Sequence, residues 1–195
     1  HLANYKDSVT VQCDLLKVDG EYAVNTVSFG FDVHIAENVN RFRSLFKGEG
    51  TTPYYTGMLA SLVTLKNDVY KIQLDQEKLP EQEEMFVVFG NGQYYGGGYR
   101  PCPQAQPDDG QMDVCLVHPL PKHKLIQLAD VYRTGQHVQL DGLTKLYTAK
   151  VAHLDTDNLL VSANLDGEIR RVINPTIELC PGMIRLALPI KKTGE

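Results

Sequence analysis

Two short acidic motifs carry the residue types in this chain that are best suited to chemistry. Asp108-Asp109-Gly110 and Asp166-Gly167-Glu168 each set carboxylates beside a glycine. A loop that gathers a carboxylate and free backbone carbonyls supplies the oxygen ligands that a hard cation needs. A carboxylate next to a substrate hydroxyl can orient that hydroxyl and accept its proton. The two motifs are therefore candidates for a cation site and for a general base.

Both motifs are also ordinary turn sequences. Asp and Gly favour tight turns for purely local reasons, and Asp-Gly between two alternating segments is a common hairpin turn. Taken singly, each motif is explained more simply as a turn than as a site. A function for either one depends on the elements that position it.

The first motif lies in a glycine- and proline-rich stretch between two apolar runs, Met85–Phe89 and Met112–Val117, which we interpret as buried strands. Tyr94, Tyr95 and Tyr99 are large groups to leave in water, so we expect an ordered loop here. Glycine in such a loop lets the backbone take a positive φ or approach another segment closely.

The remaining elements follow from apolar periodicity. Alternation predicts strands at Ser8–Lys17, Tyr22–Phe29 and Val69–Leu74, and four-and-three spacing predicts helices over Ile35–Phe46 and Tyr55–Val63. We interpret Asp75–Glu84 as a solvated loop, and a third helix is expected to end at Thr134-Gly135. The last third reads as strand after strand: Lys145–Leu154, Leu159–Leu165, Glu168–Ile173, Thr176–Cys180 and Met183–Leu188, with Pro181-Gly182 as a turn. This pattern predicts an α+β fold, mainly an antiparallel β-sandwich with a few inserted helices.

Composition limits the function classes. A chain of 195 residues is long enough for one domain with a substantial core. The net charge of -5, with no block of Lys or Arg, argues against a general nucleic-acid binder. The four cysteines show neither zinc-site spacing nor a disulfide framework, which indicates reduced thiols in a cytoplasmic protein. We identify no signal peptide and no apolar run long enough to cross a bilayer.

Four motifs, in this order and spacing, resemble one protein family. They are Asn25-x-x-Ser-x-Gly30-x-Asp32; Phe86-Val-Val-Phe-Gly-Asn91-Gly-x-Tyr-Tyr-Gly96-Gly-Gly98, followed by Asp108-Asp109-Gly110-x-Met-Asp113; Asn164-Leu-Asp166-Gly167-Glu168; and Cys180-Pro-Gly-Met-Ile-Arg-Leu-Ala-Leu-Pro189. Together they resemble the C-terminal domain of the bacterial diacylglycerol kinase family, the YegS-like lipid kinases related to sphingosine and ceramide kinases. The resemblance covers nearly the whole chain and depends on the combination of motifs.

The resemblance implies a two-domain enzyme of which this chain, residues 1–195, is the second domain. The family joins an N-terminal α/β domain with a G-G-D-G-T nucleotide motif to a β-sandwich domain, and this sequence has no G-G-D-G-T. We therefore expect the N-terminal nucleotide-binding domain to be absent from this chain, most of the ATP site to lie in it, and the fragment alone to be inactive. The start at His1 also indicates a fragment, although a processed or tagged start would look the same.

The resemblance also implies roles for individual residues. It implies a structural Mg²⁺ held by the side chain of Asp109 and the backbone carbonyls of Gln106 and Gln111. It implies a general base in Asp166-Gly167-Glu168, with Asp166 and Glu168 both remaining candidates. The residues expected at the interdomain cleft or substrate site are Asn25, Gly30, Asp32, Asn91, Gly96, Gly97 and Gly98. A helix cap is the alternative for Asp32, and loop shaping is the alternative for the three consecutive glycines.

The function implied is that of an ATP- and Mg²⁺-dependent lipid kinase acting on the hydroxyl of diacylglycerol or a related lipid. A non-catalytic lipid- or metabolite-binding module and an NAD kinase are the alternatives. Tyr55–Val63 is a candidate lining for an acyl-chain cavity, or plain core packing. The expected partners are the lipid substrate, the chain's own N-terminal domain and a second copy in a homodimer, with no nucleic acid. With no basic amphipathic segment, contact with membranes should be peripheral and brief, from the cytoplasm.

Overall fold

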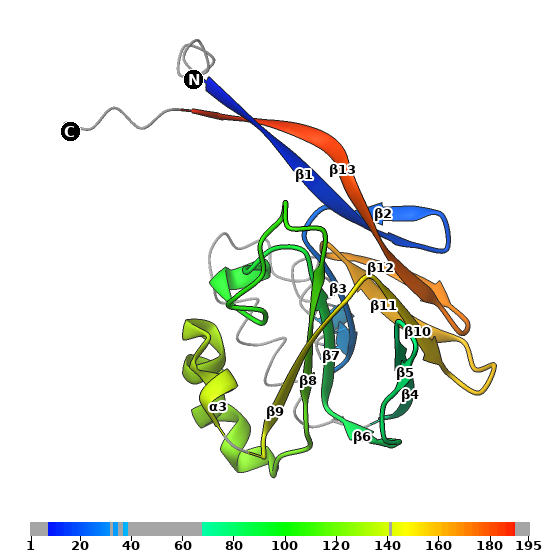
Figure 1. The fold of residues 1–195 in the computed structure, drawn as a ribbon. Coiled ribbons are helices and arrows are strands. Elements are labelled where there is room, and N and C mark those ends of the chain that lie inside the picture. The colour runs from blue at the N-terminus through cyan, green and yellow to red at the C-terminus, as the bar shows by residue number, and fades with distance from the viewer. Residues whose placement is uncertain (1–7, 32, 35–36, 39–67, 141, 190–195) are drawn as a thin grey trace.

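Two antiparallel sheets packed face to face form the body of the molecule in the computed structural model (Figure 1), which describes residues 8–31, 33–34, 37–38, 68–140 and 142–189. The seven-stranded sheet contains, in spatial order, β2 (Glu21–Ala23), β1 (Ser8–Val18), β13 (Thr176–Pro189), β10 (Val151–Asp155), β4 (Asp68–Leu74) and β5 (Glu77–Lys78), with β6 (Gln82–Glu84) also paired to β4. The six-stranded sheet contains β12 (Glu168–Val172), β11 (Val161–Leu165), β3 (Thr26–Gly30), β7 (Phe86–Gly90), β8 (Met112–Val117) and β9 (Thr144–Ala149). The predicted fold class, an α+β β-sandwich, is confirmed.

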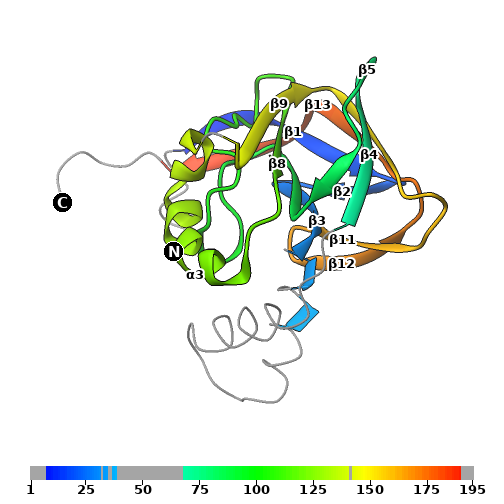
Figure 2. The same ribbon diagram turned by 90° about the horizontal axis from the view of Figure 1, so that it is seen from below.

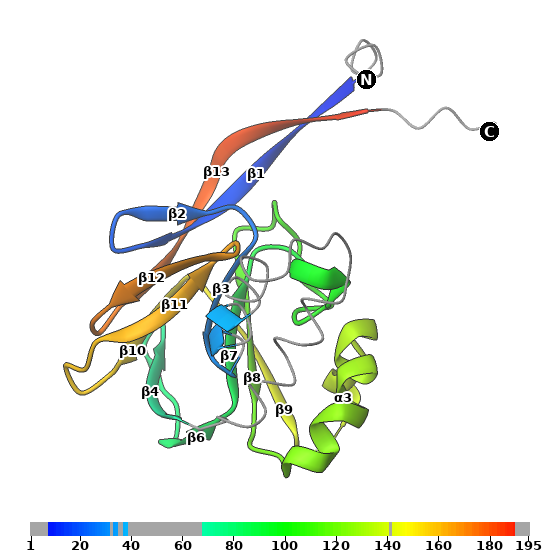
Figure 3. The same cartoon turned by 180° about the vertical axis from the view of Figure 1, so that it is seen from behind.

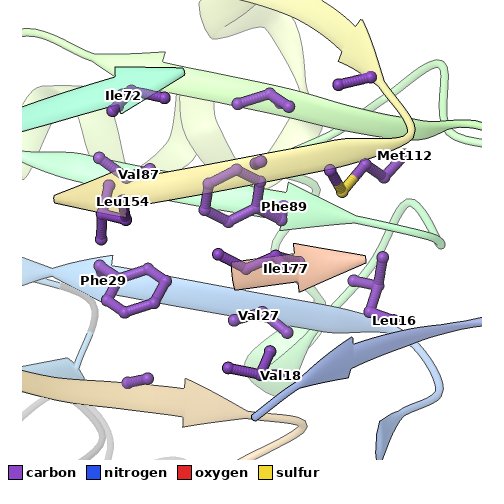
Figure 4. Close-up of a cluster of buried hydrophobic side chains, with 14 of the residues drawn as sticks. Leu16, Val18, Val27, Phe29, Ile72, Val87, Phe89, Met112, Leu154 and Ile177 are labelled. Carbon is purple, nitrogen blue, oxygen red and sulfur yellow. The ribbon is translucent and has the colours of Figure 1, made fainter. Parts of the chain in front are cut away.

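The first core fills the space between the two sheets (Figure 4). Along β7, Val87 and Phe89 enter this core, while the alternate residues Phe86 and Val88 enter a second core on the other face of the same sheet. A strand buried on both faces reads as a continuous apolar run, which is why the sequence marked β7 and β8 so clearly.

The second core lies under α3 (Lys122–Thr134), which packs beside β8 and β9 on the side away from β4 (Figure 2). The ring of Tyr132 stacks on Phe86 with centroids 5.4 Å apart. The helix ends as predicted, because Gly135 takes the left-handed conformation with φ 77° and its N–H is donated to the carbonyl of Tyr132. Two short 3₁₀ turns, η2 (Gly96–Gly98) and η3 (Gln136–Gln139), complete the described helices.

Two predicted strands are each divided between the two sheets. Tyr22–Phe29 becomes β2 and β3, and Lys145–Leu154 becomes β9 and β10, with each member of a pair in a different sheet. At the first break the alternation continues, since Ala23, Val27 and Phe29 all face the first core; at the second it shifts by one residue, from Ala149 to Ala152. Periodicity alone therefore does not show where the chain changes sheets.

The segment predicted as a solvated loop between Asp75 and Glu84 instead contains β5 and β6. Glu84 is only 1% exposed and its Oε2 lies 3.0 Å from Nδ1 of His118. Burial raises the pKa of this carboxyl. The sequence suggested a loop because the segment is polar, yet its last residue is buried against a histidine from the end of β8.

The predicted turn at Pro181-Gly182 is also wrong, because β13 runs without a break from Thr176 to Pro189. Opposite it, the pairing register with β1 shifts between Cys13 and Leu15. Pro181 and Gly182 thus belong to a β-bulge, in which Gly182 takes a positive φ of 60°. The β1–β13 ribbon that results projects from the body of the sandwich (Figure 1).

The predicted helices over Ile35–Phe46 and Tyr55–Val63 lie outside the described residues, apart from short pieces at the start of the first. Within the part of the chain that the structure describes, no helix has both the length and the apolar character needed to cross a bilayer.

Candidate functional site

The D-G-E motif forms the turn of the β11–β12 hairpin. Asp166 and Gly167 occupy the two central positions with φ 49° and 98°, and Leu165 pairs with Glu168 across the turn. Positive φ at both central residues is the signature of the hairpin turns that match strand twist. The local interpretation as a turn is therefore confirmed, and the turn fixes where its two carboxylates point.

The Asp166 carboxylate is bound to the backbone of the β2–β3 connection. Its oxygens accept N–H hydrogen bonds from Val24, from Asn25 at 3.1 Å and from Thr26 at 2.8 Å. These charge-assisted bonds join two hairpins that are far apart in sequence. Because its acceptor sites are occupied by the protein's own backbone, Asp166 is suited to holding the turn in place.

The Glu168 carboxylate faces solvent on the same turn, with its side chain 70% exposed. Among the residues that the structure describes, its partner is Arg170, whose guanidinium also pairs with Glu21 on β2 of the other sheet. An exposed ion pair of this kind is worth little and exchanges readily with water or substrate. Of the two candidate bases, Glu168 is therefore the one whose oxygens remain accessible.

Asn25 connects this turn to the glycine-rich loop. Its carbonyl accepts N–H bonds from Asn91 at 2.8 Å and from Gly92 at 3.2 Å, and its side-chain amide donates to the carbonyl of Tyr94. A Cβ on Gly92 would lie 2.0 Å from Oδ1 of Asn25, so only glycine fits under this side chain. Asn25 thus holds the start of the glycine-rich loop against β3.

Asn91 links the start of the glycine-rich loop to β1. It is 1% exposed, and its Nδ2 donates both to the carbonyl of Val24 at 2.8 Å and to that of Asp14 at 2.9 Å. Its Oδ1 is buried and has no hydrogen-bond partner among the residues that the structure describes. An amide that bridges two backbone segments in this way fixes their separation.

Asp14 is a residue of this site that the sequence analysis missed. It is 3% exposed, and its carboxylate accepts N–H bonds from Gly110 at 2.9 Å and from Gly182 at 2.7 Å. Its own N–H is donated to the carbonyl of Pro107 at 2.7 Å. Alternation along β1 placed Asp14 on the polar side of the strand, whereas in the structure it is buried where the β1–β13 register shifts.

Through Asp14 the D-D-G loop is anchored to the β1–β13 ribbon, at the end of β8 where Figure 1 shows the loop rising toward that ribbon. Within the loop, Oδ1 of Asp109 accepts the N–H of Gln111 at 3.0 Å. Asp108, Asp109, Gln106 and Gln111 are all exposed. The residues proposed as cation ligands therefore lie on one ordered turn that is open to solvent.

Negative charge is concentrated around this turn. Burial and the neighbouring charge of Asp109 raise the pKa of Asp113 to about 6. Burial, together with the charges of Asp108 and Asp14, raises the pKa of the Cys13 thiol. No three His, Cys, Asp or Glu side chains converge as a metal-ligand set in the described residues. The hard oxygen donors and the crowded negative charge both fit Mg²⁺.

The three glycines Gly96, Gly97 and Gly98 form η2 in the glycine-rich loop, next to an isolated bridge between Tyr95 and Tyr99. Gly98 has φ 77°, and a Cβ on either Gly96 or Gly98 would meet open space. Glycine is thus required for conformation at Gly98.

Arg100 braces the glycine-rich loop from one side. It donates to Oε1 of Gln93 at 2.7 Å and to the carbonyl of Pro103 at 2.9 Å, and it lies 5.4 Å from the ring centre of Tyr94. This guanidinium is committed to the loop itself, so it is not available as a preformed anion site.

Gly30 is not brought to this site, because it ends β3 at the opposite end from Asn25. Its φ is 87°, and a Cβ there would lie 2.5 Å from the carbonyl oxygen of Met85. Glycine is needed for the close approach of β3 and β7, with the N–H of Phe31 donated to Met85. Asp32 lies outside the described residues.

Comparison with known proteins gives a consistent result. Residues 25–188 match the family described as the YegS C-terminal NAD kinase beta sandwich-like domain. A protein of Mycobacterium tuberculosis named diacylglycerol kinase is 29% identical over 160 residues, which is 82% of this chain and 50% of that protein. A protein of Stenotrophomonas maltophilia named a probable YegS-like lipid kinase is 28% identical over 180 residues, covering 90% of this chain and 57% of that protein.

Among solved structures, a diacylglycerol kinase from Bacillus anthracis superimposes with a TM-score of 0.61 at 21% identity. The match covers 91% of this chain and 53% of that one. At this identity the likeness shows the fold. The chain spans about half the length of the curated relatives it matches.

Proposed function

The chain belongs to the family of YegS C-terminal NAD kinase β-sandwich-like domains, and from this premise we propose that it is the C-terminal domain of an ATP- and Mg²⁺-dependent lipid kinase. The proposed acceptor is the hydroxyl of diacylglycerol or a related lipid, as the names of relatives suggest. The observation that carries the proposal is the D-G-E turn, in which Asp166 is held by three backbone N–H groups and Glu168 is left accessible.

In this proposal Glu168 is the general base and Asp166 is a positioning residue. Glu168 accepts the proton of the lipid hydroxyl as that oxygen attacks phosphorus. Asp166 keeps the turn fixed on the β2–β3 connection, so that Glu168 stays near the substrate. A carboxylate that is paired at the surface with an arginine can give up that contact when a hydroxyl binds.

Mg²⁺ would be held by the Asp109 side chain and by the carbonyls of Gln106 and Gln111, where it would neutralise the crowded carboxylates. Asp14 would keep that turn in place through its bond to Gly110. ATP, when bound, supplies the γ-phosphoryl group. Because Arg100 is already used within the glycine-rich loop, we assign most of the ATP contacts to an N-terminal nucleotide-binding domain of the same protein. The Asn25, Asn91 and Gly96–Gly98 segment would face that domain and the substrate.

The experiment uses the polypeptide as the source cell makes it, sized first by immunoblot with an antibody to this domain. Transfer of labelled phosphate from ATP is measured with diacylglycerol in mixed micelles, and in parallel with other lipid alcohols and with NAD. We expect lipid phosphorylation that Glu168→Gln lowers about 10²- to 10⁴-fold. Asp166→Asn should lower it as well, with loss of stability, whereas Glu168→Gln should leave the fold unchanged.

Lipid phosphorylation that persists in both Glu168→Gln and Asp166→Asn would contradict the assignment of the general base. Labelled NADP in place of a labelled lipid would indicate the NAD kinase alternative. The alternative of a non-catalytic binding module would be favoured if the native polypeptide were no larger than this chain, bound lipid and transferred no phosphate. Cytoplasmic location, peripheral contact with membranes and a homodimer are further parts of the proposal for the whole protein.

A further inference from the structure

At one end of the sandwich, two neighbouring connections expose large apolar side chains. They link β10 to β11 and β12 to β13, and they lie side by side in Figures 1 and 3. Leu159 is 66% exposed, Leu160 is 58% exposed and Ile173 is 50% exposed. We call these three residues the apolar tip. Single exposed apolar residues are ordinary, but a group of three large ones on adjoining loops usually marks a contact surface.

Hydrogen bonds among polar groups of the same loops hold them together. Thr156 is 7% exposed, and its hydroxyl donates to the carbonyl of Leu159 at 2.7 Å. Oδ1 of Asn174 accepts the N–H of Thr156 at 2.9 Å, and Nδ2 of Asn174 donates to Oδ1 of Asn158 at 2.8 Å. Asn158 and Asn174 themselves are exposed, so the apolar side chains share this end of the sandwich with polar groups that bind one another.

The loops that carry the apolar tip are held in one conformation. Asp157, Asn158 and Asn174 all have positive φ, between 45° and 60°, in a region that asparagine and aspartate tolerate best. The backbone N–H of Asp157 is donated to Oδ1 of Asp155. A preorganised tip loses little conformational entropy when it binds, so its apolar surface is available for contact at low cost.

Charges around the tip are balanced. Asp157 pairs with Lys71, which also pairs with Glu81, and the exposed Arg171 lies on β12 beside the tip. There is no excess of positive charge to attract anionic lipid headgroups. The chemistry therefore fits an electrically neutral surface that accepts apolar side chains.

We propose that the apolar tip inserts into the interfacial layer of a lipid bilayer and tethers the domain there. The partner rests on the proposed function, because a diacylglycerol acceptor resides in a bilayer. Diacylglycerol has a small neutral headgroup and so leaves gaps between larger headgroups, which suits insertion of leucine side chains. Leu160 and Asp166 flank the two ends of β11, so the tip acts about 20 Å from the D-G-E turn. It is a tether, separate from the site of chemistry.

The first test uses the fact that the chain contains no tryptophan. Leu160→Trp places a single fluorophore on the apolar tip, and Leu188→Trp places one on β13, where Leu188 is 48% exposed. On addition of phosphatidylcholine vesicles containing diacylglycerol, we expect the emission of the first variant to shift to the blue and that of the second to stay unchanged. No shift for Leu160→Trp, or an equal shift for both variants, overturns the proposal. A concentration-dependent shift without vesicles would assign the tip to contact with a second copy and would also overturn it.

The second test measures co-sedimentation of the 195-residue chain with the same vesicles. Leu159→Asn with Leu160→Asn should lower the fraction bound about tenfold or more, and Leu186→Asn with Leu188→Asn, a matched pair on β13, should not. Binding at high salt should equal binding at low salt, because no charge attraction is involved. Equal losses for the two pairs overturn the proposal. Because no phosphate transfer is measured, a tether that binds vesicles in a protein without kinase activity would separate this inference from the proposed function.

Discussion

Two regions of the molecule hold their ionisable side chains in opposite ways. At the end of the sheet that carries the acidic turns, Asp14 and Asp166 each accept backbone N–H bonds, two and three respectively. In the second core, Cys102, Cys115 and His137 are buried among apolar and aromatic side chains. Burial raises the pKa of both thiols and lowers that of His137 to about 4.

The difference shows which region is built for charge. Where carboxylates are surrounded by N–H donors, their charge is stabilised and holds distant loops together. Where ionisable groups have no charged partner, burial forces them to be neutral and they act as packing residues. The candidate site is in the first region, and the cysteines and the histidine of the second are structural.

The largest effect should come from removing the buried carboxylate that ties the D-D-G turn to the β1–β13 ribbon. Asp14→Ala leaves the N–H groups of Gly110 and Gly182 without an acceptor and should lower the free energy of unfolding by about 3 kcal/mol. The matched control is Asp108→Ala, an exposed carboxylate of the D-D-G turn, with a change within about 0.5 kcal/mol. Urea denaturation measures both. Equal values for the two variants would contradict the role given to Asp14.

A smaller loss is expected at the D-G-E turn. Asp166→Ala removes the acceptor of three backbone N–H groups, but water can partly replace it at this exposed position, so we expect a loss of about 2 kcal/mol. Glu168→Ala breaks only an exposed pair with Arg170 and should cost less than about 1 kcal/mol. The same denaturation experiment decides between them. If Glu168→Ala proved the more damaging variant, the positioning role would belong to Glu168.

The sequence predicted most of the fold, because the strands of the six-stranded sheet are marked by apolar runs and alternation. It failed where a strand changes sheets, at the Ala23–Thr26 break and at Lys150. Alternation is the same on both sides of the first break, and at the second it shifts by only one residue, from Ala149 to Ala152. It also failed at Pro181-Gly182, where a turn signal marks a bulge. Both failures concern pairing between distant segments, which local pattern does not encode.

Of the candidate site, the sequence identified Asn25, Asn91 and the two acidic motifs through their joint resemblance to one family. It could not separate Asp166 from Glu168, since their difference lies in contacts with residues far away in the chain. Asp14 carried no signal, because an aspartate at an alternate position of a half-buried strand looks like any solvent-facing residue. Gly30 shared a motif with Asn25, yet the intervening strand places the two at opposite ends of β3.

The burial of His137 in the second core should make the free energy of unfolding depend on pH. The pKa of His137 is about 4 in the folded chain and 6.5 in the unfolded chain. As the pH falls below about 6.5, the unfolded chain therefore binds a proton at His137 that the folded chain binds only near pH 4. Stability should therefore fall by about 1 to 2 kcal/mol between about pH 7 and pH 5 from this group. His137→Phe, which keeps an aromatic ring against Tyr132, should show a shallower decline, while the exposed His153→Gln should match the wild type. Denaturation at a series of pH values measures this. An unchanged slope in His137→Phe would mean that another group carries the dependence.

The smallest predicted effect is stabilisation by Mg²⁺, which should depend on the D-D-G turn and not on the D-G-E turn. If the D-D-G turn holds Mg²⁺, the ion binds the folded chain only, and saturating Mg²⁺ should raise the melting temperature by about 2 to 4 °C. Burial and the neighbouring charge of Asp109 raise the pKa of Asp113, and a cation on the D-D-G turn would relieve the repulsion between these carboxylates. Asp109→Asn should abolish the response, and Asp108→Asn and Glu168→Gln should preserve it, because neither of these side chains is a proposed ligand. Thermal denaturation with Mg²⁺ or with a chelator measures the shift. A response retained in Asp109→Asn, or missing from the wild type, would remove the ion from the D-D-G turn and leave Asp14 and Gly110 as a purely structural contact.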